Sequence, residues 1–228
     1  EDLVQQWHRT SRHAWSVEMM CRQPQVSDCV YPEFDPAVHV REDDPVGDNQ
    51  PWIGGMDFGL RNPTVMLWAR VCNDTNNNHG VIHVMDEYLC SGITFEQHMS
   101  AINKQASLQG WPRPDWLGVD PAGNQRNSHT GISDVQALRR LGYAVKTKRS
   151  TLRDGIERVR RRLDRRTLYI HPRCTRLIEA MRQYHFDINH PQREDPVKDG
   201  PDHLCDALRY MIVNLEVGSK TLTATSYL

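Results

Sequence analysis

Apolar residues recur in a regular pattern only after about residue 51. Six short runs rich in β-branched and aromatic residues are typical of strands, and the first three are joined by tight connections, which favours an antiparallel meander. The runs cover residues 52–59, 64–72, 81–90, 115–120 and 143–147, with 167–172 as a short edge strand.

Between and after these runs, apolar residues spaced three and four apart predict helices. The helices cover residues 94–109, 133–141, 151–165 and 174–186, and a last one begins near residue 201. Thr94 and Ser133 can cap two of them, whereas residues 121–131 are expected to form a loop. The order of elements predicts an α/β fold with a mixed sheet, three antiparallel strands followed by parallel crossovers, covered by helices.

Residues 1–48 lack this regularity. Residues 1–25 have a mainly helical pattern, and the Pro- and Asp-rich stretch that follows predicts a linker with one short extended piece. We therefore expect a linker segment over residues 1–48, without a core of its own, and one folded domain over residues 49–228. No basic and apolar leader is visible at Glu1, so we expect no secretory signal and a chain that is part of something longer.

Composition narrows the class of protein. Charged residues make up 25% and hydrophobic residues 38% of the 228 residues, as in soluble globular proteins, and no run of about 18 apolar residues could span a bilayer. The six cysteines are scattered without a C-x-x-C pair. This argues against a zinc knuckle and predicts reduced, mostly buried thiols in a cytosol.

The formal net charge of −1 hides a strongly basic segment. Between Arg139 and Arg166, twelve Lys and Arg stand against three acidic residues, which indicates a polyanionic partner. A solvated, Arg-rich helix face is the alternative. The residues that we expect to hold the backbone of duplex DNA are Lys146, Lys148, Arg149, Arg153, Arg158, Arg161, Arg162 and Arg165.

Acidic residues lie at two strand ends and on the last helix. Asp57 ends the first run and Asp120 the fourth, so the crossover topology can make them neighbours in the sheet. The motif "DHLCDALRY" adds Asp202, His203 and Asp206 from the last helix. Converging carboxylates repel each other unless a cation is bound, and oxygen-rich ligation favours Mg²⁺ or Mn²⁺, with one His acceptable for Mn²⁺. Two such ions would clamp a phosphodiester during in-line attack by water.

Each of these residues also has a purely structural interpretation. Asp57 and Asp120 could simply start turns, Asp202 could cap the last helix, and His203 could be a surface histidine at the helix end.

Four stretches carry a resemblance to a known family. They are "GGMDFGLRNPTVMLW", "WLGVDPAGNQRN", "LYIHPRCTRLIEAMRQYHFD" and "DHLCDALRY". Together they make the chain from Trp52 to Leu215 resemble the C-terminal nuclease domain of the large terminase subunit of tailed bacteriophages, in the ribonuclease H-like superfamily. The stretch from Trp7 to Val40 is similar to the connection between motor and nuclease in that family.

The resemblance implies cleavage of concatemeric double-stranded DNA during genome packaging, by two divalent ions on acidic residues. Asp57 and Asp120 match the strand acids of the family, and Asp206 matches a further acid on the last helix. Many members have an acid where this chain has His203, so the third ligand stays open between Asp202 and His203. The implied partners are double-stranded DNA, the ATPase motor of the same full-length protein, the small terminase subunit and the portal, in the host cytoplasm.

Two other functions stay open. A resolvase or transposase of the same superfamily would share the acids but should lack the preceding connection. A non-catalytic DNA-binding or portal-docking module would have no use for converging acids. No G-x-x-x-x-G-K-[ST] motif occurs, so we expect no ATP hydrolysis by this chain alone, and no base-reading element is visible in the basic segment, so we expect nonspecific cleavage.

Overall fold

The structure, a computed structural model, describes residues 29–43, 46, 50–58, 63–72, 80–124, 131–186, 195–198 and 200–216. The strands in these residues are β1 (Trp52–Asp57), β2 (Thr64–Cys72), β3 (Val81–Cys90), β4 (Trp116–Val119), β5 (Val145–Lys146) and β6 (Leu168–Ile170). The helices are α3 (Pro36–His39), α4 (Phe95–Gln109), α5 (Asp134–Arg140), α6 (Leu152–Asp164), α7 (Thr175–Gln183) and α8 (Asp202–Glu216), with a 3-10 turn η1 (Pro121–Asn124). The helix predicted over residues 1–25 lies outside the described residues.

The strands form one mixed sheet in the order β5-β4-β1-β2-β3-β6. β1, β2 and β3 pair antiparallel, and β4, β5 and β6 each pair parallel with a neighbour. The predicted α/β class, the antiparallel meander and the edge position of β6 are therefore confirmed.

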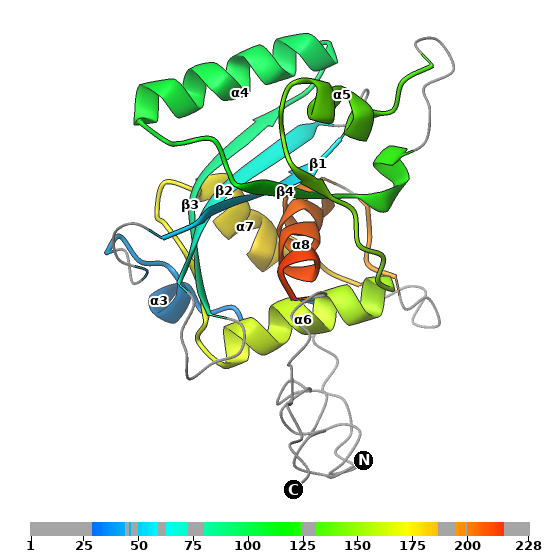
Figure 1. Cartoon of the computed structure of the whole chain (residues 1–228). Coiled ribbons are helices and arrows are strands. Elements are labelled where there is room, and N and C mark those ends of the chain that lie inside the picture. Colours follow the sequence, from blue (N-terminus) through cyan, green and yellow to red (C-terminus); the bar gives the residue numbers. More distant parts are fainter. Residues whose placement is uncertain are drawn as a thin grey trace, which may run out of the picture.

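Helices cover both faces of the sheet. α4 and α5 lie on one face, and α6, α7 and α8 lie on the other (Figure 1). Successive side chains of a strand point to opposite faces, so Val65 and Leu67 of β2 join the core with α8, whereas Met66 and Trp68 join the core with α4. Burial on both faces explains why β2 is a continuous apolar run and does not alternate with polar residues.

Local sequence signals fix several element ends. Thr94 and Ser133 cap α4 and α5, each in a capping box with a glutamine three residues later. The loop expected over residues 121–131 needs a correction, because η1 forms at its start. Asp120 Oδ1 accepts a hydrogen bond from the Ala122 amide at 2.9 Å and tightens the chain into this turn. Residues 125–130 lie outside the described part.

The segment before the sheet packs against the domain where it is described. Val30 and Tyr31 are 0% and 1% exposed and share the core that includes α7 and α8. The Val30 amide donates to the Tyr184 carbonyl at 2.8 Å, and Val40 forms a bridge with Ile170 of β6. These residues therefore belong physically to the folded unit, while the boundary near residue 48 stays a prediction.

The five described cysteines are free. Cys174 and Cys205 are buried, and Cys29, Cys72 and Cys90 are half-buried. Burial raises the pKa of the Cys174 and Cys205 thiols, so both are protonated and poorly reactive in the folded chain.

Candidate active site

The sheet brings the two strand-end acids together. Met56 of β1 pairs in parallel with Val119 of β4, so Asp57 and Asp120 leave the same edge of the sheet on adjacent strands. This juxtaposition was predicted from the order of elements and is confirmed by the register. The roles of the two acids stay predictions.

Glycines let α8 lie directly on these two strands. A Cβ on Gly55 of β1 would collide with the Ala207 carbonyl oxygen of α8, and a Cβ on Gly118 of β4 would lie 2.7 Å from the Tyr210 carbonyl oxygen. Helix and strand backbones therefore touch with no side chain between them. As a result, residues in the first turns of α8 lie close enough to the strand ends to meet the strand acids.

His203 contacts the first strand acid directly. Its Nδ1 lies 2.9 Å from Asp57 Oδ2, and this hydrogen bond raises the pKa of the His203 imidazole. Burial raises the pKa of the Asp57 carboxyl, and the charges of Asp206 and Asp120 act in the same direction. The charges of the three acids thus disfavour one another, and a bound cation would relieve that repulsion.

Asp202 has a different environment. Its side chain is buried, with the residue 5% exposed, and its Oδ1 accepts a hydrogen bond from the Gly200 amide at 2.9 Å. The structure therefore brings His203, and not Asp202, into contact with a strand acid. Through this hydrogen bond, the carboxylate of Asp202 stabilises the start of α8.

Asp206, one turn further along α8, pairs with Arg209. Arg209 Nε and Nη2 donate to Asp206 Oδ1 at 3.2 and 2.9 Å. Burial raises the pKa of the Asp206 carboxyl, and the Arg209 charge opposes that rise.

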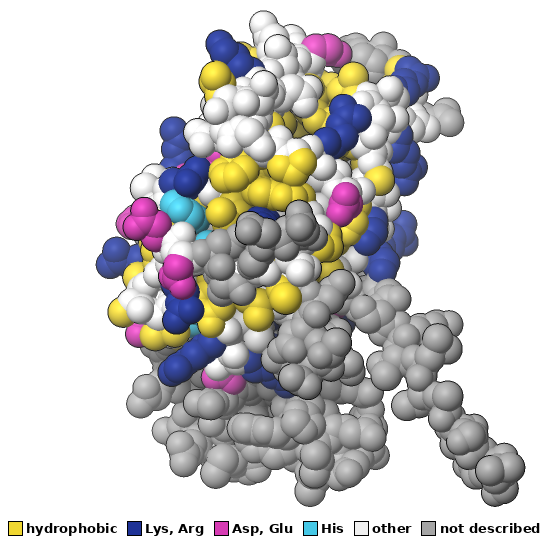
Figure 2. Space-filling model, turned by 60° about the vertical axis from the view of Figure 1, so that its left-hand side comes forward, with side chains coloured by type: hydrophobic (Ala, Val, Ile, Leu, Met, Phe, Trp, Pro, Cys, Tyr) yellow, Lys and Arg dark blue, Asp and Glu magenta, His cyan; other side chains and the backbone are white. Residues whose placement is uncertain are grey.

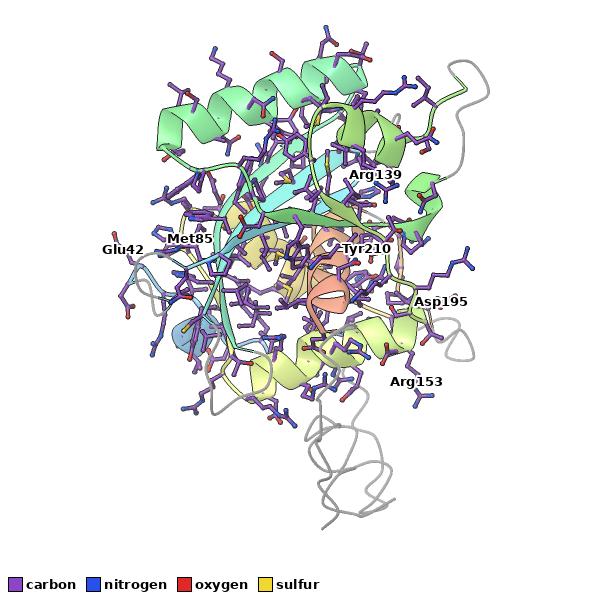
Figure 3. The ribbon with its side chains drawn as sticks, in the orientation of Figure 1. Glu42, Met85, Arg139, Arg153, Asp195 and Tyr210 are labelled. Atoms are coloured by element: carbon purple, nitrogen blue, oxygen red, sulfur yellow. The ribbon has the colours of Figure 1, made fainter. Side chains whose placement is uncertain are left out.

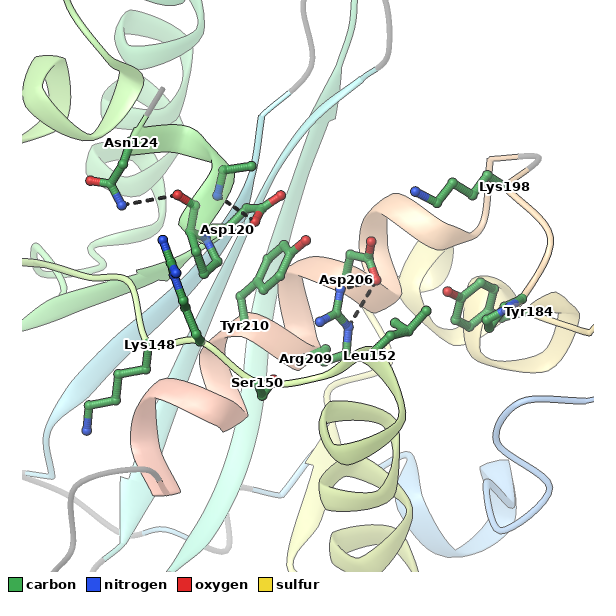
Figure 4. A pocket seen from close by; sticks show the side chains of 14 residues that line it. Asp120, Asn124, Lys148, Ser150, Leu152, Tyr184, Lys198, Asp206, Arg209 and Tyr210 are labelled. Carbon is green, nitrogen blue, oxygen red and sulfur yellow. Dashed lines mark hydrogen bonds and ion pairs between the residues drawn. The ribbon is translucent and has the colours of Figure 1, made fainter. Parts of the chain in front are cut away.

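A cleft of about 630 Å³ opens beside these acids. Asp120 and Asp206 both line it, and Tyr210 lies between them in the close-up (Figure 4). Lys148 and Arg149 line the cleft as well, and so does the exposed Lys198 before α8. The cleft therefore combines carboxylates with flanking cations, which suits a phosphate-containing substrate.

The donor set fits divalent metal ions in its chemistry. Asp57, Asp120 and Asp206 each use one carboxylate oxygen in a hydrogen bond, and the other oxygen makes none with the residues that the structure describes. Free carboxylate oxygens are the ligands that Mg²⁺ and Mn²⁺ prefer. Among the described residues no three His, Cys, Asp or Glu side chains yet form a metal-binding group, so the carboxylates would have to turn toward a shared ion.

The basic segment divides into buried and exposed residues. Arg162 is 2% exposed, with Nε 2.7 Å from Glu216 Oε1 and Nη1 3.1 Å from the Gly80 carbonyl oxygen. Its predicted contact with DNA is therefore wrong, because its guanidinium is buried inside the fold. Arg158 and Arg161 also bind Glu216, at 3.0 and 2.7 Å. These three arginines join α6 to the end of α8.

The other predicted DNA contacts lie nearer the surface. Arg153 and Arg165 are exposed, and Arg153 projects outward from the start of α6 (Figure 3). Lys146 stacks on Trp116, with Nζ 3.8 Å from the ring centroid. Of the predicted set, Lys148 and Arg149 are the residues that line the cleft.

The side of the molecule that carries α3 has a different surface. Figure 2 turns it forward and shows hydrophobic side chains gathered across the middle, with Lys, Arg, Asp and Glu interspersed around them.

Sequence reasoning missed several cleft residues. Lys198, Tyr184 and Arg209 line the cleft, but they come from three separate segments and no local pattern marks them. Gly55 and Gly118 had a usable signal, because a glycine inside a strand pattern indicates a close backbone approach.

Comparisons with known proteins identify relatives of this chain. The family model of the terminase RNaseH-like domain matches residues 54–215. The terminase large subunit of Escherichia phage T5 is 29% identical over 168 residues, which cover 72% of this chain and 35% of that protein. The chain therefore spans about a third of the length of this curated relative, given the 35% coverage.

Solved structures share the fold. The large terminase nuclease domain of P22 matches with a TM-score of 0.61 at 18% identity and covers 83% of this chain and 98% of that one. A longer large terminase, from a thermophilic bacteriophage, matches with a TM-score of 0.64 at 22% identity, over 81% of this chain and 43% of that one. The large terminase nuclease from thermophilic phage G20c, with bound magnesium, matches with a TM-score of 0.54 at 12% identity, over 82% of this chain and 97% of that one.

Proposed function

Because this chain belongs to the family of terminase RNase H-like domains, we propose that it is a divalent-metal-dependent endonuclease that cuts concatemeric double-stranded DNA during genome packaging. One observation carries the proposal. Asp120, at the end of β4, and Asp206 of α8 line a cleft flanked by cations. Their charges also act on the carboxyl of Asp57, at the end of the neighbouring strand β1. A non-catalytic DNA-binding module would gain nothing from acids placed where phosphate must approach.

Asp57, Asp120 and Asp206 would hold two Mg²⁺ or Mn²⁺ ions, with His203 as the fourth ligand residue. The bound ions would stabilise the charge on the phosphodiester and activate water. Asp202 remains the alternative to His203, although its hydrogen bond to the Gly200 amide favours a structural role. Solved nucleases of the G20c phage carry magnesium, cobalt or zinc, which supports the use of a divalent ion.

The protein itself positions the substrate. Lys148, Arg149 and Lys198 flank the acids in the cleft and would bind phosphates next to the scissile bond, which keeps the backbone close to the carboxylates. Such contacts read no base edges. Nonspecific cleavage by the isolated domain follows from this arrangement.

The family match favours a terminase over a resolvase or transposase of the same superfamily. As the resemblance of the sequence to large terminase subunits implies, the partners would be an ATPase motor in the same full-length protein, the small terminase subunit and the portal. The place of action would be the host cytoplasm. None of the described helices is both long and apolar enough to cross a membrane.

The experiment is plasmid cleavage by the purified chain in Mg²⁺ or Mn²⁺. Asp57→Asn keeps the shape of the side chain but removes the charge that holds the cation, so cleavage should vanish while circular dichroism stays that of the parent. Affinity for DNA should stay equal or rise slightly, because a negative charge beside phosphate is removed.

Glu96→Gln is the matched control. It neutralises an exposed acid on α4, which lies on the face of the sheet opposite to α8 (Figure 1). This variant should cut DNA at the parent rate. Cleavage by Asp57→Asn at the parent rate would rule out the proposed site.

A further inference from the structure

Arg209 is a buried cation at the wall of the cleft. The residue is 7% exposed, and Figure 4 shows its guanidinium directed at Asp206. Nε and Nη2 both donate to Asp206 Oδ1, whereas Oδ2 and Arg209 Nη1 make no hydrogen bond with described residues. Arg209 therefore fixes the carboxylate by one oxygen and leaves the other oxygen open.

The aliphatic stem of the Arg209 side chain packs against α6 at Gly155. A Cβ on Gly155 would lie 2.7 Å from Arg209 Cδ and 2.8 Å from Cγ, closer than such atoms can approach. Glycine inside a helix is destabilising relative to alanine, so this position costs α6 stability. The missing side chain is what gives the Arg209 stem its path to Asp206.

The geometry points to Arg209 as a positioning residue of the nuclease site, seated by Gly155 and acting through Asp206. By holding Oδ1, it fixes the Asp206 carboxylate and leaves Oδ2 available for an ion that Asp57 and Asp120 would share. Its charge offsets the mutual repulsion of the three acids when no ion is bound.

Arginine suits this role better than lysine would. The planar guanidinium can place two donors on a single carboxylate oxygen and still direct a third donor elsewhere, whereas an ammonium is a point charge. The catalytic part of the inference, that Arg209 orients Asp206 for cleavage, rests on the proposed nuclease function. The structural part, that Arg209 packs against Gly155, can be tested without measuring cleavage.

The structural test is a double-mutant cycle on thermal stability with Gly155→Ala and Arg209→Ala. In the parent, Gly155→Ala should lower the melting temperature, because the new methyl group collides with the Arg209 stem. In the Arg209→Ala background, the same change should raise it, because alanine favours the helix. The same shift in both backgrounds would overturn the seating of Arg209 by Gly155.

The functional test measures Mn²⁺ binding by electron paramagnetic resonance without DNA, and kcat and KM for cleavage at saturating Mn²⁺. In Arg209→Gln, the Mn²⁺ affinity should change little, because the loss of ligand orientation weakens binding whereas the loss of a positive charge beside the ion strengthens it. The kcat should nevertheless fall by at least about tenfold, as when groups that orient metal ligands are removed.

Arg209→Lys should bind Mn²⁺ like the parent and recover only part of kcat. Arg182→Gln, which neutralises an arginine with 61% side-chain exposure on α7, is the control and should change neither value. A parent-like kcat in Arg209→Gln would overturn the positioning role, whatever the Mn²⁺ affinity of that variant. A parent chain that neither binds Mn²⁺ nor cuts would instead refute the proposed function, and the stability cycle would still decide the structural part.

Discussion

His203 and Asp202 are adjacent in the chain but face different partners. His203 Nδ1 bonds Asp57 Oδ2, whereas Asp202 Oδ1 bonds the Gly200 amide just before the helix. Neighbouring residues of a helix point about 100° apart, so one of them meets the strand acids while the other holds the helix start.

Substitutions of the two residues are therefore expected to have different effects. His203→Asn should reduce cleavage strongly at unchanged stability, because it alters a side chain at the acid cluster. Asp202→Asn should keep most of the cleavage activity and most of the stability, because the side-chain amide retains an Oδ1 that can accept the hydrogen bond from the Gly200 amide. Cleavage rates and urea denaturation of both variants measure the two effects. The opposite pattern would move the third ligand from His203 to Asp202.

At the level of elements, the contact of α8 with β1 and β4 sets the geometry of the site. Gly118→Ala should destabilise the fold by about 1–3 kcal/mol or more and reduce cleavage, because its Cβ would strike the α8 backbone at Tyr210 and Met211. Denaturant unfolding and plasmid cleavage give the two values.

Gly54→Ala is the matched control for that change. Its Cβ would meet mainly the side-chain ends of Leu117 and Met66, which can shift, so the cost should be smaller. Equal costs for Gly54→Ala and Gly118→Ala would mean that α8 does not need the direct backbone contact.

The junction of α6 and α8 depends on one carboxylate. The Glu216 side chain is 1% exposed and binds Arg158, Arg161 and Arg162. Glu216→Gln should therefore lower the free energy of unfolding by about 3–5 kcal/mol, because buried arginine charge is left unbalanced.

Asp154→Asn provides the comparison in the same helix. Its side chain is 46% exposed and pairs with Arg158, so its loss should cost only about 0.3–0.5 kcal/mol. Thermal or urea unfolding of both variants measures the two losses of stability. If Glu216→Gln loses as little as Asp154→Asn, the Glu216 cluster contributes little to stability.

Elements were predictable where local chemistry determines them. The capping residues Thr94 and Ser133, the continuous apolar run of β2 and the strand-end acids all carry their signal within a few positions. The site was predictable only in part. The path of the Arg209 side chain depends on Gly155, and the burial of Arg162 depends on Glu216, each more than 50 residues away along the chain. An arginine-rich helix gives the same pattern whether its cations face DNA or a buried carboxylate.

At the scale of the whole molecule, the position of a basic residue in the sequence does not show whether its side chain reaches the cleft. Twelve basic residues fall between Arg139 and Arg166, but three of these arginines bind Glu216 inside the fold. Of the cations that line the cleft in the described part of the chain, Lys198 and Arg209 lie outside that segment.

The salt dependence of DNA binding tests this placement. Replacing Lys148 and Arg149 by Gln should weaken binding equally for unrelated sequences and reduce the slope of log K against log salt by about 0.9 for each phosphate that is no longer neutralised. The double control Lys104→Gln with Arg182→Gln removes the same charge from α4 and α7. An unchanged slope in the cleft variant, or an equal change in the control, would place DNA elsewhere.

The order of elements in the chain also affects when the site can exist. Asp57 ends the first strand, Asp120 follows the fourth, and His203 and Asp206 lie on α8, the last described helix. During synthesis, α8 leaves the ribosome after every strand of the sheet. A nascent chain therefore lacks His203 and Asp206, and it also lacks the helix that covers β1 and β4. Under the proposed function, cleavage should therefore appear only after α8 has been synthesised, and a nascent chain that stops before α8 should not cut DNA.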